Sequence, residues 1–265
     1  MTETDPVLCA IDRRGIATLT LNRPEIGNAY NGALIAALGS VLARLASEKA
    51  LHAVVLRGAG RHFQAGADLS FLESLRRASP EENLDFSRRT AAAIAALQHF
   101  PRPTLALVRG GCFGGGVGLS SACDIAIAAE DALFAISEVR WGITPAPIIP
   151  LLVARVGARA LSRYALSGER FGAAEALRIG LVHEVAPAER LEASAERVLE
   201  SVLKAAPEAV ATTKRLIAEA GAAPDTPAFR ERLAVEAASR RLLPEADEGF
   251  QSFAEKRSPA WYSAR

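Results

Sequence analysis

The chain has 265 residues, half of them hydrophobic, and a formal net charge of +1 from 31 basic and 30 acidic side chains. This length allows a large buried core, and the near-neutral charge gives no overall field that would attract nucleic acid or a membrane surface. Residues 1–6 are acidic and lack the apolar core of a secretory signal, and the longest uncharged stretches, 110–123 and 141–154, are too short to span a bilayer. We therefore expect no nucleic acid partner and no membrane association.

Three cysteines, Cys9, Cys112 and Cys123, are an odd number and lack CxxC spacing. This pattern favours small buried hydrophobic residues over a disulfide framework or a zinc site, and it indicates a reducing, cytoplasmic compartment. The four histidines share no metal-ligand spacing, so no metal site is expected.

Strands and helices alternate along the first 190 residues. Alternating side chains predict a strand over 16–21, and apolar residues at helical spacing predict a helix over 31–47. The further predicted elements are strands at 53–57, 104–108 and 124–128, a small-residue helix at 90–97, and another that ends near Cys123. The polar stretch 73–85 is predicted to be mobile or loosely helical. Because strand and helix recur without a fixed repeat length, we expect a layered α/β core.

From residue 187 onward the pattern becomes helical. Helices are predicted at 191–205, 207–220, 226–243 and 244–256, with proline at or near several of their starts. We divide the chain into a core at 1–190, which contains the ligand site, and a helical region at 191–265. This region has few strands to cover, so we expect it to pack on a neighbouring subunit or on its own core as a lid.

Two short glycine-bearing stretches, 64–69 (QAGADL) and 113–119 (FGGGVGL), each follow a predicted buried strand. Small residues let a ligand approach the backbone closely, and a helix start leaves N–H groups unpaired with partial positive charge. Two such turns that face each other would form an oxyanion hole with two donors. The run 116–121 nearly fits GxGxxG, but Ser121 replaces the last glycine and no Gly-Lys-Ser/Thr follows, which disfavours a nucleotide loop.

With these elements in place, the chain resembles the crotonase family of enoyl-CoA hydratases and isomerases along nearly its whole length. The resemblance rests on six stretches in the same order, 21–24, 63–69, 113–124, 134–145, 168–185 and 249–257. It implies an α/β fold, a ββα spiral core with a C-terminal α-helical trimerisation region, and assembly as a homotrimer or a hexamer. The ligand would be an acyl-CoA thioester, so coenzyme A is part of the substrate and no separate cofactor is expected.

The resemblance also assigns the oxyanion hole and the catalytic acid. The thioester oxygen would be held by the backbone N–H groups of Ala67 and Gly115, where donors of this kind stabilise the enolate-like anion. Of the two glutamates that family hydratases commonly use, the first falls on Gly118 and is therefore absent, whereas the second falls on Glu138. The non-catalytic alternative for Glu138 is a surface carboxylate in an ion pair with Arg140. For catalysis its pKa must be raised, and Val139, Trp141 and Ile143 could supply the apolar surroundings.

A single glutamate leaves three functions open. It can activate water and return the proton, which is hydration of a 2-enoyl-CoA, or it can carry a proton from the α- to the γ-carbon, which is an isomerisation. Family isomerases often keep only the second glutamate, but the stretch 137–146 resembles the hydratase branch that acts on methylglutaconyl-type branched acyl-CoAs, so hydration is favoured. The third hypothesis is a crotonase-like protein that only binds CoA or RNA.

The resemblance places the rest of coenzyme A as well. Glu25 and Ile26 would lie beside the nucleotide, and Ala65, Asp68 and Leu69 would line the pocket through their backbone. Phe253 and Lys256 match the position where the family meets the adenine and the 3′-phosphate, sometimes across a subunit boundary. From the residues alone, Asp68 is better suited to cap the first glycine turn and Asp124 to a structural role.

Overall fold

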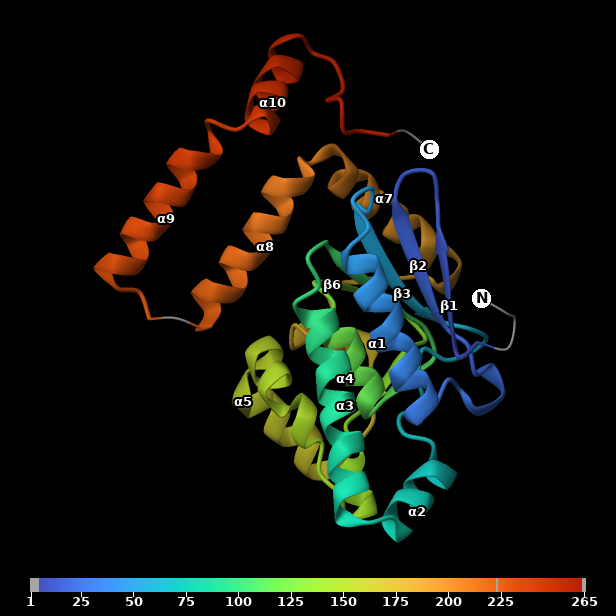
Figure 1. Cartoon of the computed structure of the whole chain (residues 1–265). Helices are drawn as coiled ribbons and strands as arrows, with labels where there is room; N and C mark the ends of the chain where they lie inside the picture. Colours follow the sequence, from blue (N-terminus) through green and yellow to red (C-terminus); the bar gives the residue numbers. More distant parts are fainter. Residues whose placement is uncertain (1–4, 223, 264–265) are drawn as a thin grey trace.

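The computed structural model describes residues 5–222 and 224–263. A six-stranded sheet forms the centre of the protein (Figure 1). Its order is β1 (Val7–Ile11), β2 (Ile16–Leu21), β3 (Ala53–Gly58), β4 (Thr104–Val108), β6 (Ile125–Ala129) and β9 (Glu184–Ala186). The β1–β2 pair is antiparallel and the other neighbours are parallel. Because spatial order follows chain order, each connection returns and adds one strand to the edge, as a spiral requires.

A second, three-stranded sheet accompanies the first. It consists of β5 (Gly111–Phe113), β7 (Leu133–Ala135) and β8 (Phe171–Gly172), in that order. The spiral turn that contains β4 therefore contributes a long strand to the large sheet, a short strand to the small sheet and then a helix. This ββα pattern is the predicted one. These short strands were not predicted, because two or three residues carry too little periodicity.

Helices cover both faces of the large sheet. One face carries α1 (Gly32–Ala46), α3 (Pro80–Gln98), α4 (Gly115–Ala122) and α5 (Ile149–Ser167), whose buried side chains share one core with inward residues such as Leu19, Leu56 and Val108. The alternate residues, such as Val55 and Leu107, pack against α7 (Leu191–Lys204) on the opposite face. Parallel strands that are buried on both sides read as continuous apolar runs, and the sequence shows such runs.

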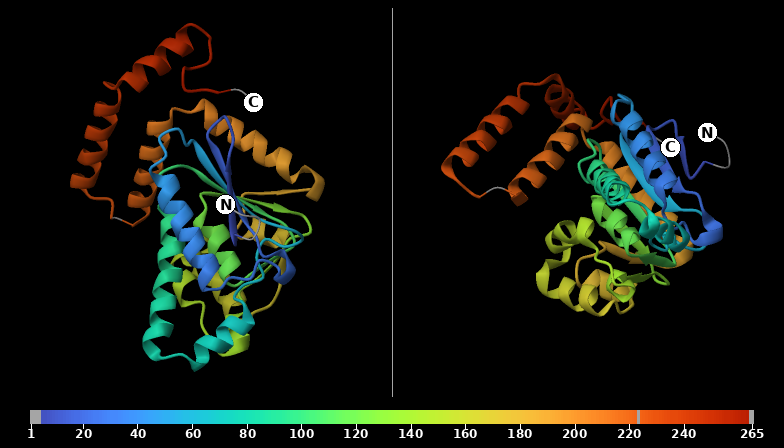
Figure 2. Two further views of the ribbon diagram at one scale, coloured as in Figure 1. Left: turned by 45° about the vertical axis from the view of Figure 1, so that its right-hand side comes forward. Right: turned by 60° about the horizontal axis from the view of Figure 1, so that its bottom comes forward.

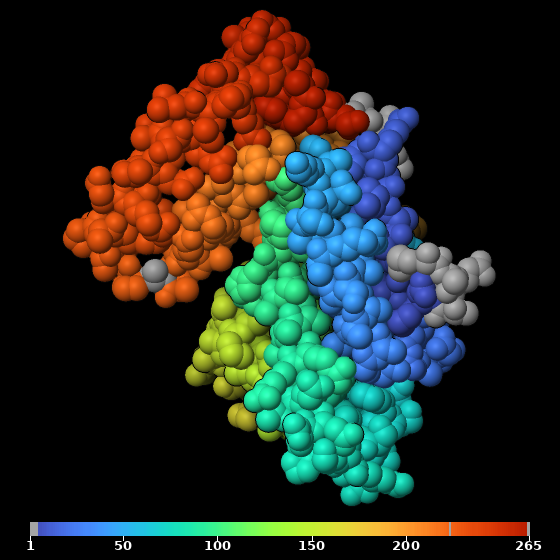
Figure 3. Space-filling view, in the orientation of Figure 1, coloured from blue at the N-terminus to red at the C-terminus, as the bar shows by residue number. Residues whose placement is uncertain are grey.

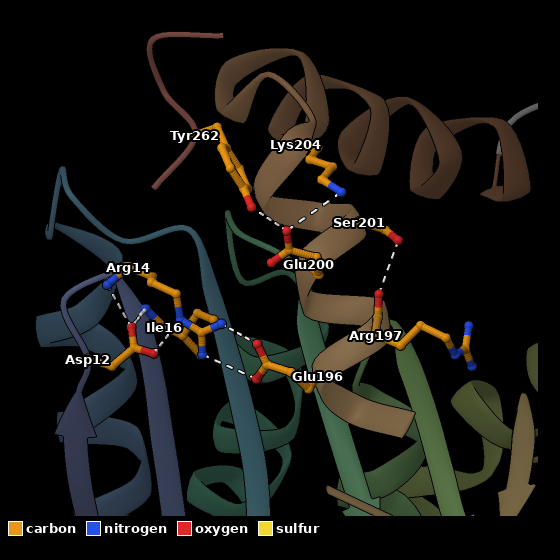
Figure 4. Close-up of polar contacts among 9 residues, drawn as sticks. All are labelled: Asp12, Arg14, Ile16, Glu196, Arg197, Glu200, Ser201, Lys204 and Tyr262. Atoms are coloured by element: carbon orange, nitrogen blue, oxygen red, sulfur yellow. Dashed lines mark hydrogen bonds and ion pairs between the residues drawn. The ribbon is translucent and has the colours of Figure 1, made fainter. Parts of the chain in front are cut away.

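Charged residues fasten α7 to the first hairpin (Figure 4). The largely buried Arg14 guanidinium pairs with Asp12 on the same hairpin and with Glu196 on α7. Further along α7, Glu200 accepts a hydrogen bond from the Tyr262 hydroxyl, which fastens the last described residues to this helix. If Asp12 or Glu196 were removed, the largely buried Arg14 charge would lose a partner, which destabilises the folded state. These contacts therefore help to hold α7 against the first hairpin.

The stretch 73–85 was predicted to be mobile or loosely helical, and the structure shows it as parts of two regular helices. The helix α2 (Leu69–Arg77) ends two residues before Ser79, and α3 begins directly after Ser79. Ser79 and Glu82 form a capping box, in which each side chain receives a backbone N–H of the other, and Pro80 occupies the first turn. This local signal was overlooked because the charged residues dominate the composition.

The last three helices form an arm that projects from the core (Figures 1 and 2). It comprises α8 (Pro207–Ala222), α9 (Pro227–Arg240) and α10 (Pro244–Ala254), as predicted. Figure 3 shows the arm standing away from the body, with a notch between it and the segment that contains α5. Large apolar side chains on the arm are exposed, namely Ile217, Val235, Leu242, Phe250 and Phe253. The arm therefore does not cover its own core as a lid, while the division at residue 190 stays a prediction.

Candidate active site

The two glycine-bearing turns lie side by side. Gln64 and Cys112 form a parallel bridge, in which the Gln64 amide donates to the Gly111 carbonyl at 3.1 Å and the Phe113 amide donates to the Gln64 carbonyl at 2.9 Å. A Cβ on Gly66 would lie 3.3 Å from the Phe113 oxygen. The turns are thus in contact, as the sequence predicted for two halves of one site.

Both turns contain backbone N–H groups without an internal acceptor. Gly115 is the first residue of α4, where an amide has no partner within the helix. Ala67 lies between two residues whose backbone is occupied, because the Tyr30 amide donates to Gly66 and the Asp68 amide donates to Tyr30. Among the backbone hydrogen bonds of the described residues, neither the Ala67 amide nor the Gly115 amide is a donor, and the same holds for the neighbouring amides of Gly66, Gly116 and Val117. The amides of Ala67 and Gly115 are the two that the sequence assigned to the oxyanion hole.

A cavity of about 450 Å³ opens beside these turns. The first turn contributes Ala65, Gly66 and Ala67, and the second contributes Phe113 and Gly114. Opposite walls come from the α2 residues Leu69 and Leu72, and from a group around the short helix η2 (Glu138–Trp141) and the end of α5. That group consists of Ser137, Glu138, Arg140, Trp141, Ile143, Gly168 and Arg170.

Glu138 lies directly against the second turn. A Cβ on Gly114 would be 2.8 Å from Glu138 Oε1, and Gly114 has a φ of +51°, so the residue must be glycine for two independent reasons. Tyr30 also lies near this carboxyl. Burial and, to a smaller extent, the negative charge of Glu138 raise the pKa of the Tyr30 hydroxyl to about 12. The acid therefore stands beside the start of α4, next to the predicted oxyanion donor.

The Glu138 carboxyl is buried without an ionic partner. Its Oε2 atom has no hydrogen-bond partner, and burial raises the pKa of the carboxyl above its ordinary value of 4.5. The alternative of an ion pair with Arg140 was wrong, since the Arg140 Nε donates instead to the Ser167 carbonyl at the end of α5. A raised pKa makes the carboxyl a better proton acceptor than an exposed glutamate, which is what general acid–base catalysis needs.

The expected apolar surroundings of Glu138 are only partly as predicted. Trp141 and Ile143 do line the cavity with Glu138, but their side chains are exposed, and Val139 does not line it. The contact with Gly114 and the proximity of Tyr30 contribute to the burial instead. Residues distant in the sequence therefore supply this part of the environment.

Gly118 confirms that the site has no room for a carboxylate at this position. A Cβ there would lie 2.4 Å from Cγ2 of Ile148, at the end of the short helix η3 (Ala146–Ile148). Ile148 is fully packed in the core. The space that a side chain on Gly118 would enter is thus filled by a methyl group. Among the described residues, Glu138 is the only acid in the cavity wall.

The binding residues predicted in the first half of the chain fall into three groups. Ala65 and Leu69 line the cavity. Glu25 and Ile26 form the exposed helix η1 (Pro24–Ile26), which adjoins the site because the Ala65 amide donates to Gly27 at 2.8 Å. Asp68 does not line the cavity, since its carboxylate caps α2 and pairs with Arg23 at 3.0 Å. Its contact with coenzyme A stays a prediction, whereas the capping role is confirmed.

Phe253 and Lys256 lie elsewhere. They belong to α10 and the residues that follow it, at the end of the molecule opposite α2 (Figure 1). The Phe253 side chain is 87% exposed. Within one chain, neither residue reaches the cavity, so their predicted contact with the adenine requires a second subunit.

Other polar residues have structural roles. The Asp124 carboxylate accepts bonds from the Thr104 amide at 2.8 Å and the Lys214 ammonium at 2.7 Å, so its structural assignment is confirmed. Burial raises the pKa of the Cys112 and Cys123 thiols to about 12, as expected for inert core residues. No cluster of metal-ligating side chains occurs among residues 5–222 and 224–263, and no helix in those ranges is long and apolar enough to cross a membrane.

The sequence did not point to Tyr30 or Arg170 as residues of the cavity wall. It suggested Arg140 only as an ion-pair partner of Glu138, whereas Arg140 also lines the cavity. Tyr30 packs against the first residue of α4, since a Cβ on Gly115 would lie 2.4 Å from the ring. The local sequence around these three residues does not distinguish them, because the spiral fold is what brings them close to the turns.

Comparisons with known proteins agree with this geometry. Residues 12–264 match the profile of the family described as enoyl-CoA hydratase/isomerase. This chain belongs to that family. It is 33% identical to a putative enoyl-CoA hydratase of Thermus thermophilus, over 94% of this chain and 98% of the relative. It is 32% identical to the 2,3-dehydroadipyl-CoA hydratase of Escherichia coli, over 92% and 94%.

A solved structure extends the likeness to three dimensions. An enoyl-CoA hydratase from Shewanella pealeana superposes with a TM-score of 0.92 at 33% identity, over 97% of this chain and 96% of the other. The predicted crotonase-like fold is therefore confirmed, and the protein is an enzyme of the enoyl-CoA hydratase/isomerase family.

Proposed function

We propose that the enzyme adds water to a 2-enoyl-CoA thioester. The thioester oxygen accepts hydrogen bonds from the amides of Ala67 and Gly115. The Glu138 carboxylate removes a proton from water while the hydroxyl adds to C3, and electrons move to the thioester oxygen to give an enolate. The proton held by Glu138 then passes to C2, so one molecule of water is added and the carboxylate is restored.

One observation carries this proposal. Glu138 lies against Gly114 with a buried, unpaired oxygen, next to the amide of the following residue. A carboxyl with a raised pKa is suited to accept a proton and give it back within one turnover. Preorganised amide donors act where negative charge develops and typically contribute about 3–4 kcal/mol each.

Isomerisation is the second candidate, and a specific observation favours it. The position of the first family glutamate is Gly118, and Ile148 fills the space beside it. With one acid, Glu138 could take a proton from C2 of a 3-enoyl-CoA, which leaves a dienolate on the thioester oxygen, and return that proton to C4 without water. Binding of CoA or RNA without chemistry is disfavoured, because Glu138 retains the environment of a catalytic acid and the net charge is only +1.

The names of relatives leave the acyl group open. One relative acts on a dehydroadipyl group, and the sequence stretch 137–146 resembles enzymes of branched, methylglutaconyl-type substrates. A branched 2-enoyl-CoA is therefore part of the proposal. The nucleotide would lie along Glu25, Ile26 and the Ala65 turn.

Assembly as a homotrimer, with pairing to hexamers, is proposed for the C-terminal arm. The exposed apolar residues of α8, α9 and α10 would be covered by a neighbouring subunit. The same contact would bring Phe253 and Lys256 to the coenzyme of that subunit, where the ammonium suits a phosphate.

Three substrates test the reaction. Crotonyl-CoA, a 3-enoyl-CoA and a branched glutaconyl-CoA are incubated with the wild type and with Glu138→Gln while the conjugated thioester absorbance is followed. Loss of absorbance with crotonyl- or glutaconyl-CoA supports hydration, and a gain with only the 3-enoyl-CoA supports isomerisation. Failure of the wild type with all three, or an unaffected variant, would overturn the proposed role of Glu138.

A further inference from the structure

Two arginine side chains border the cavity on the same side as Glu138. Arg140 belongs to η2, and Arg170 lies just before β8. Neither Glu25 nor Ile26, beside which the nucleotide is proposed to lie, lines the cavity, whereas both arginines do.

Neither guanidinium has an acidic partner among the described residues. Arg170 lies over the Phe113 ring, with its central carbon 5.2 Å from the ring centroid. Arg140 donates to the Ser167 carbonyl at 3.3 Å and packs on Gly168. A guanidinium always carries its charge and presents five donors, so most of this donor capacity faces the cavity or solvent.

Nearby acids are already engaged elsewhere. Glu169, the residue before Arg170, pairs with Arg163 at 2.7 Å. Asp68 pairs with Arg23. Glu138 is the only acid of the cavity wall, and it forms no ion pair within the described chain. The wall thus carries two guanidinium charges and a single carboxyl, none of which is in an ion pair within the described chain, and this excess of positive charge attracts an anion.

We propose that the acyl group of the substrate ends in a carboxylate, which Arg170 and Arg140 bind. This inference rests on the proposed function, because it places the thioester at Ala67 and Gly115 and the acyl chain toward Glu138. Arginine is suited to the task, since its planar fork binds a carboxylate through two parallel hydrogen bonds. Arg170 is already oriented by the Phe113 ring, one residue before Gly114.

Binding of unreactive thioesters tests the proposal without turnover. Adipyl-CoA and hexanoyl-CoA have the same chain length and differ in the terminal carboxylate, and both are saturated. Titration calorimetry with the wild type should give a Kd lower for adipyl-CoA by about tenfold or more, which corresponds to one charge-assisted hydrogen bond. Arg170→Gln should lose most of this preference while its Kd for hexanoyl-CoA changes less than about twofold.

A matched variant controls for surface charge. Arg89 on α3 is exposed, pairs with Asp85 and does not line the cavity, so Arg89→Gln should keep the full preference. Arg140→Gln should reduce the preference as well. Because Arg140 also donates a hydrogen bond to the end of α5, the melting temperature of the Arg140→Gln variant is measured in parallel. Its Kd values are compared only if the variant is folded.

The phosphates of coenzyme A are the other source of anions. If Arg170 binds a phosphate, Arg170→Gln will weaken adipyl-CoA and hexanoyl-CoA by the same factor. Pantetheine thioesters of the two acids lack the nucleotide phosphates, and the preference should persist with them. An equal Kd for the two thioesters in the wild type, or an equal loss in the variant, overturns the inference. A retained preference in a protein that hydrates nothing would refute the proposed function alone.

Discussion

The carboxyl group of Glu138 occupies the place where a side chain on Gly114 would begin. The two residues are 24 positions apart in the sequence, yet a Cβ on Gly114 would lie 2.8 Å from Glu138 Oε1. A side chain on Gly114 would therefore displace the carboxyl from this position. The proposed proton carrier lies beside the turn that presents the Gly115 amide.

Replacing Gly114 by alanine should abolish most activity. The new methyl group would displace the carboxyl, and a φ of +51° with a ψ of −117° strains any side chain by about 1–3 kcal/mol. We expect kcat to fall by about 10²-fold or more, in line with misplacement of a reacting group by an ångström. Steady-state kinetics and denaturant unfolding measure the two effects separately.

Gly157 provides the matched control for Gly114. Its φ is +74°, but no atom lies within 4 Å of the position that a Cβ would take, and it does not line the cavity. Gly157→Ala should lower stability by a similar amount and leave kcat nearly unchanged. If both variants lose the same activity, the contact with Glu138 is not what makes Gly114 necessary.

Glu138→Gln should lower kcat by about 10²- to 10⁴-fold, the range typical for removal of a general acid–base group. The variant keeps the shape of the side chain, so the Kd for hexanoyl-CoA should stay within a fewfold of the wild type. Glu130→Gln, at an exposed position outside the cavity, serves as the control and should be fully active. A variant at 138 that retains more than a tenth of the wild-type kcat would argue against the mechanism.

The pH dependence of stability should report the buried carboxyl. Since folding raises the pKa of Glu138 above 4.5, the native state binds more protons than the unfolded state between 4.5 and the raised pKa. The free energy of unfolding contributed by this group is therefore largest below pH 4.5 and decreases as pH rises through the window. Glu138→Gln lacks this effect, so the difference between the two curves isolates it.

The same titration should appear in the kinetics. Hydration begins with the carboxylate form of Glu138, so kcat/KM should rise with pH and reach half of its plateau at a pH above 4.5. An acidic limb centred at or below 4.5 would show that the free enzyme does not raise the pKa of its essential acid.

Filling the space beside Gly118 should destabilise the protein. Gly118→Ala places a methyl group 2.4 Å from Ile148 Cγ2, and overpacking of this kind costs about 1–3 kcal/mol. Gly39→Ala in α1 is the control, because nothing lies within 4 Å of its Cβ position and alanine favours a helix by about 1 kcal/mol.

A double-mutant cycle identifies the cause of the Gly118 effect. Ile148→Ala removes Cγ2, so the double variant Gly118→Ala/Ile148→Ala should be about 1 kcal/mol more stable than the sum of the single changes predicts. Purely additive free energies of unfolding would show that Ile148 is not the residue that restricts this position.

Much of the fold could be predicted from the sequence because its signals are local. Apolar runs marked β3 and β4, helical spacing marked α1, and prolines marked the starts of α8 and α10. The helices α2 and α3 could also have been found, since Ser79 and Glu82 form a capping box. Composition alone, with many charged residues, led only to the expectation of a mobile or loosely helical stretch there.

The site was harder to predict from the sequence, because the spiral fold brings its parts together from distant segments. The resemblance to a family located Ala67, Gly115 and Glu138. It could not show that Ile148 closes the space beside Gly118 or that Arg170 turns toward Phe113, since these contacts join segments 30 and 57 residues apart and have no local period.

Isotopically labelled water tests the central claim most directly. Crotonyl-CoA is incubated with the enzyme in water enriched in ¹⁸O, and the product is analysed by mass spectrometry. The wild type should yield a 3-hydroxyacyl-CoA with one ¹⁸O at C3, and Glu138→Gln should yield it at least about a hundred times more slowly. A product whose double bond has moved without uptake of ¹⁸O, or equal rates for the two proteins, would contradict hydration by Glu138.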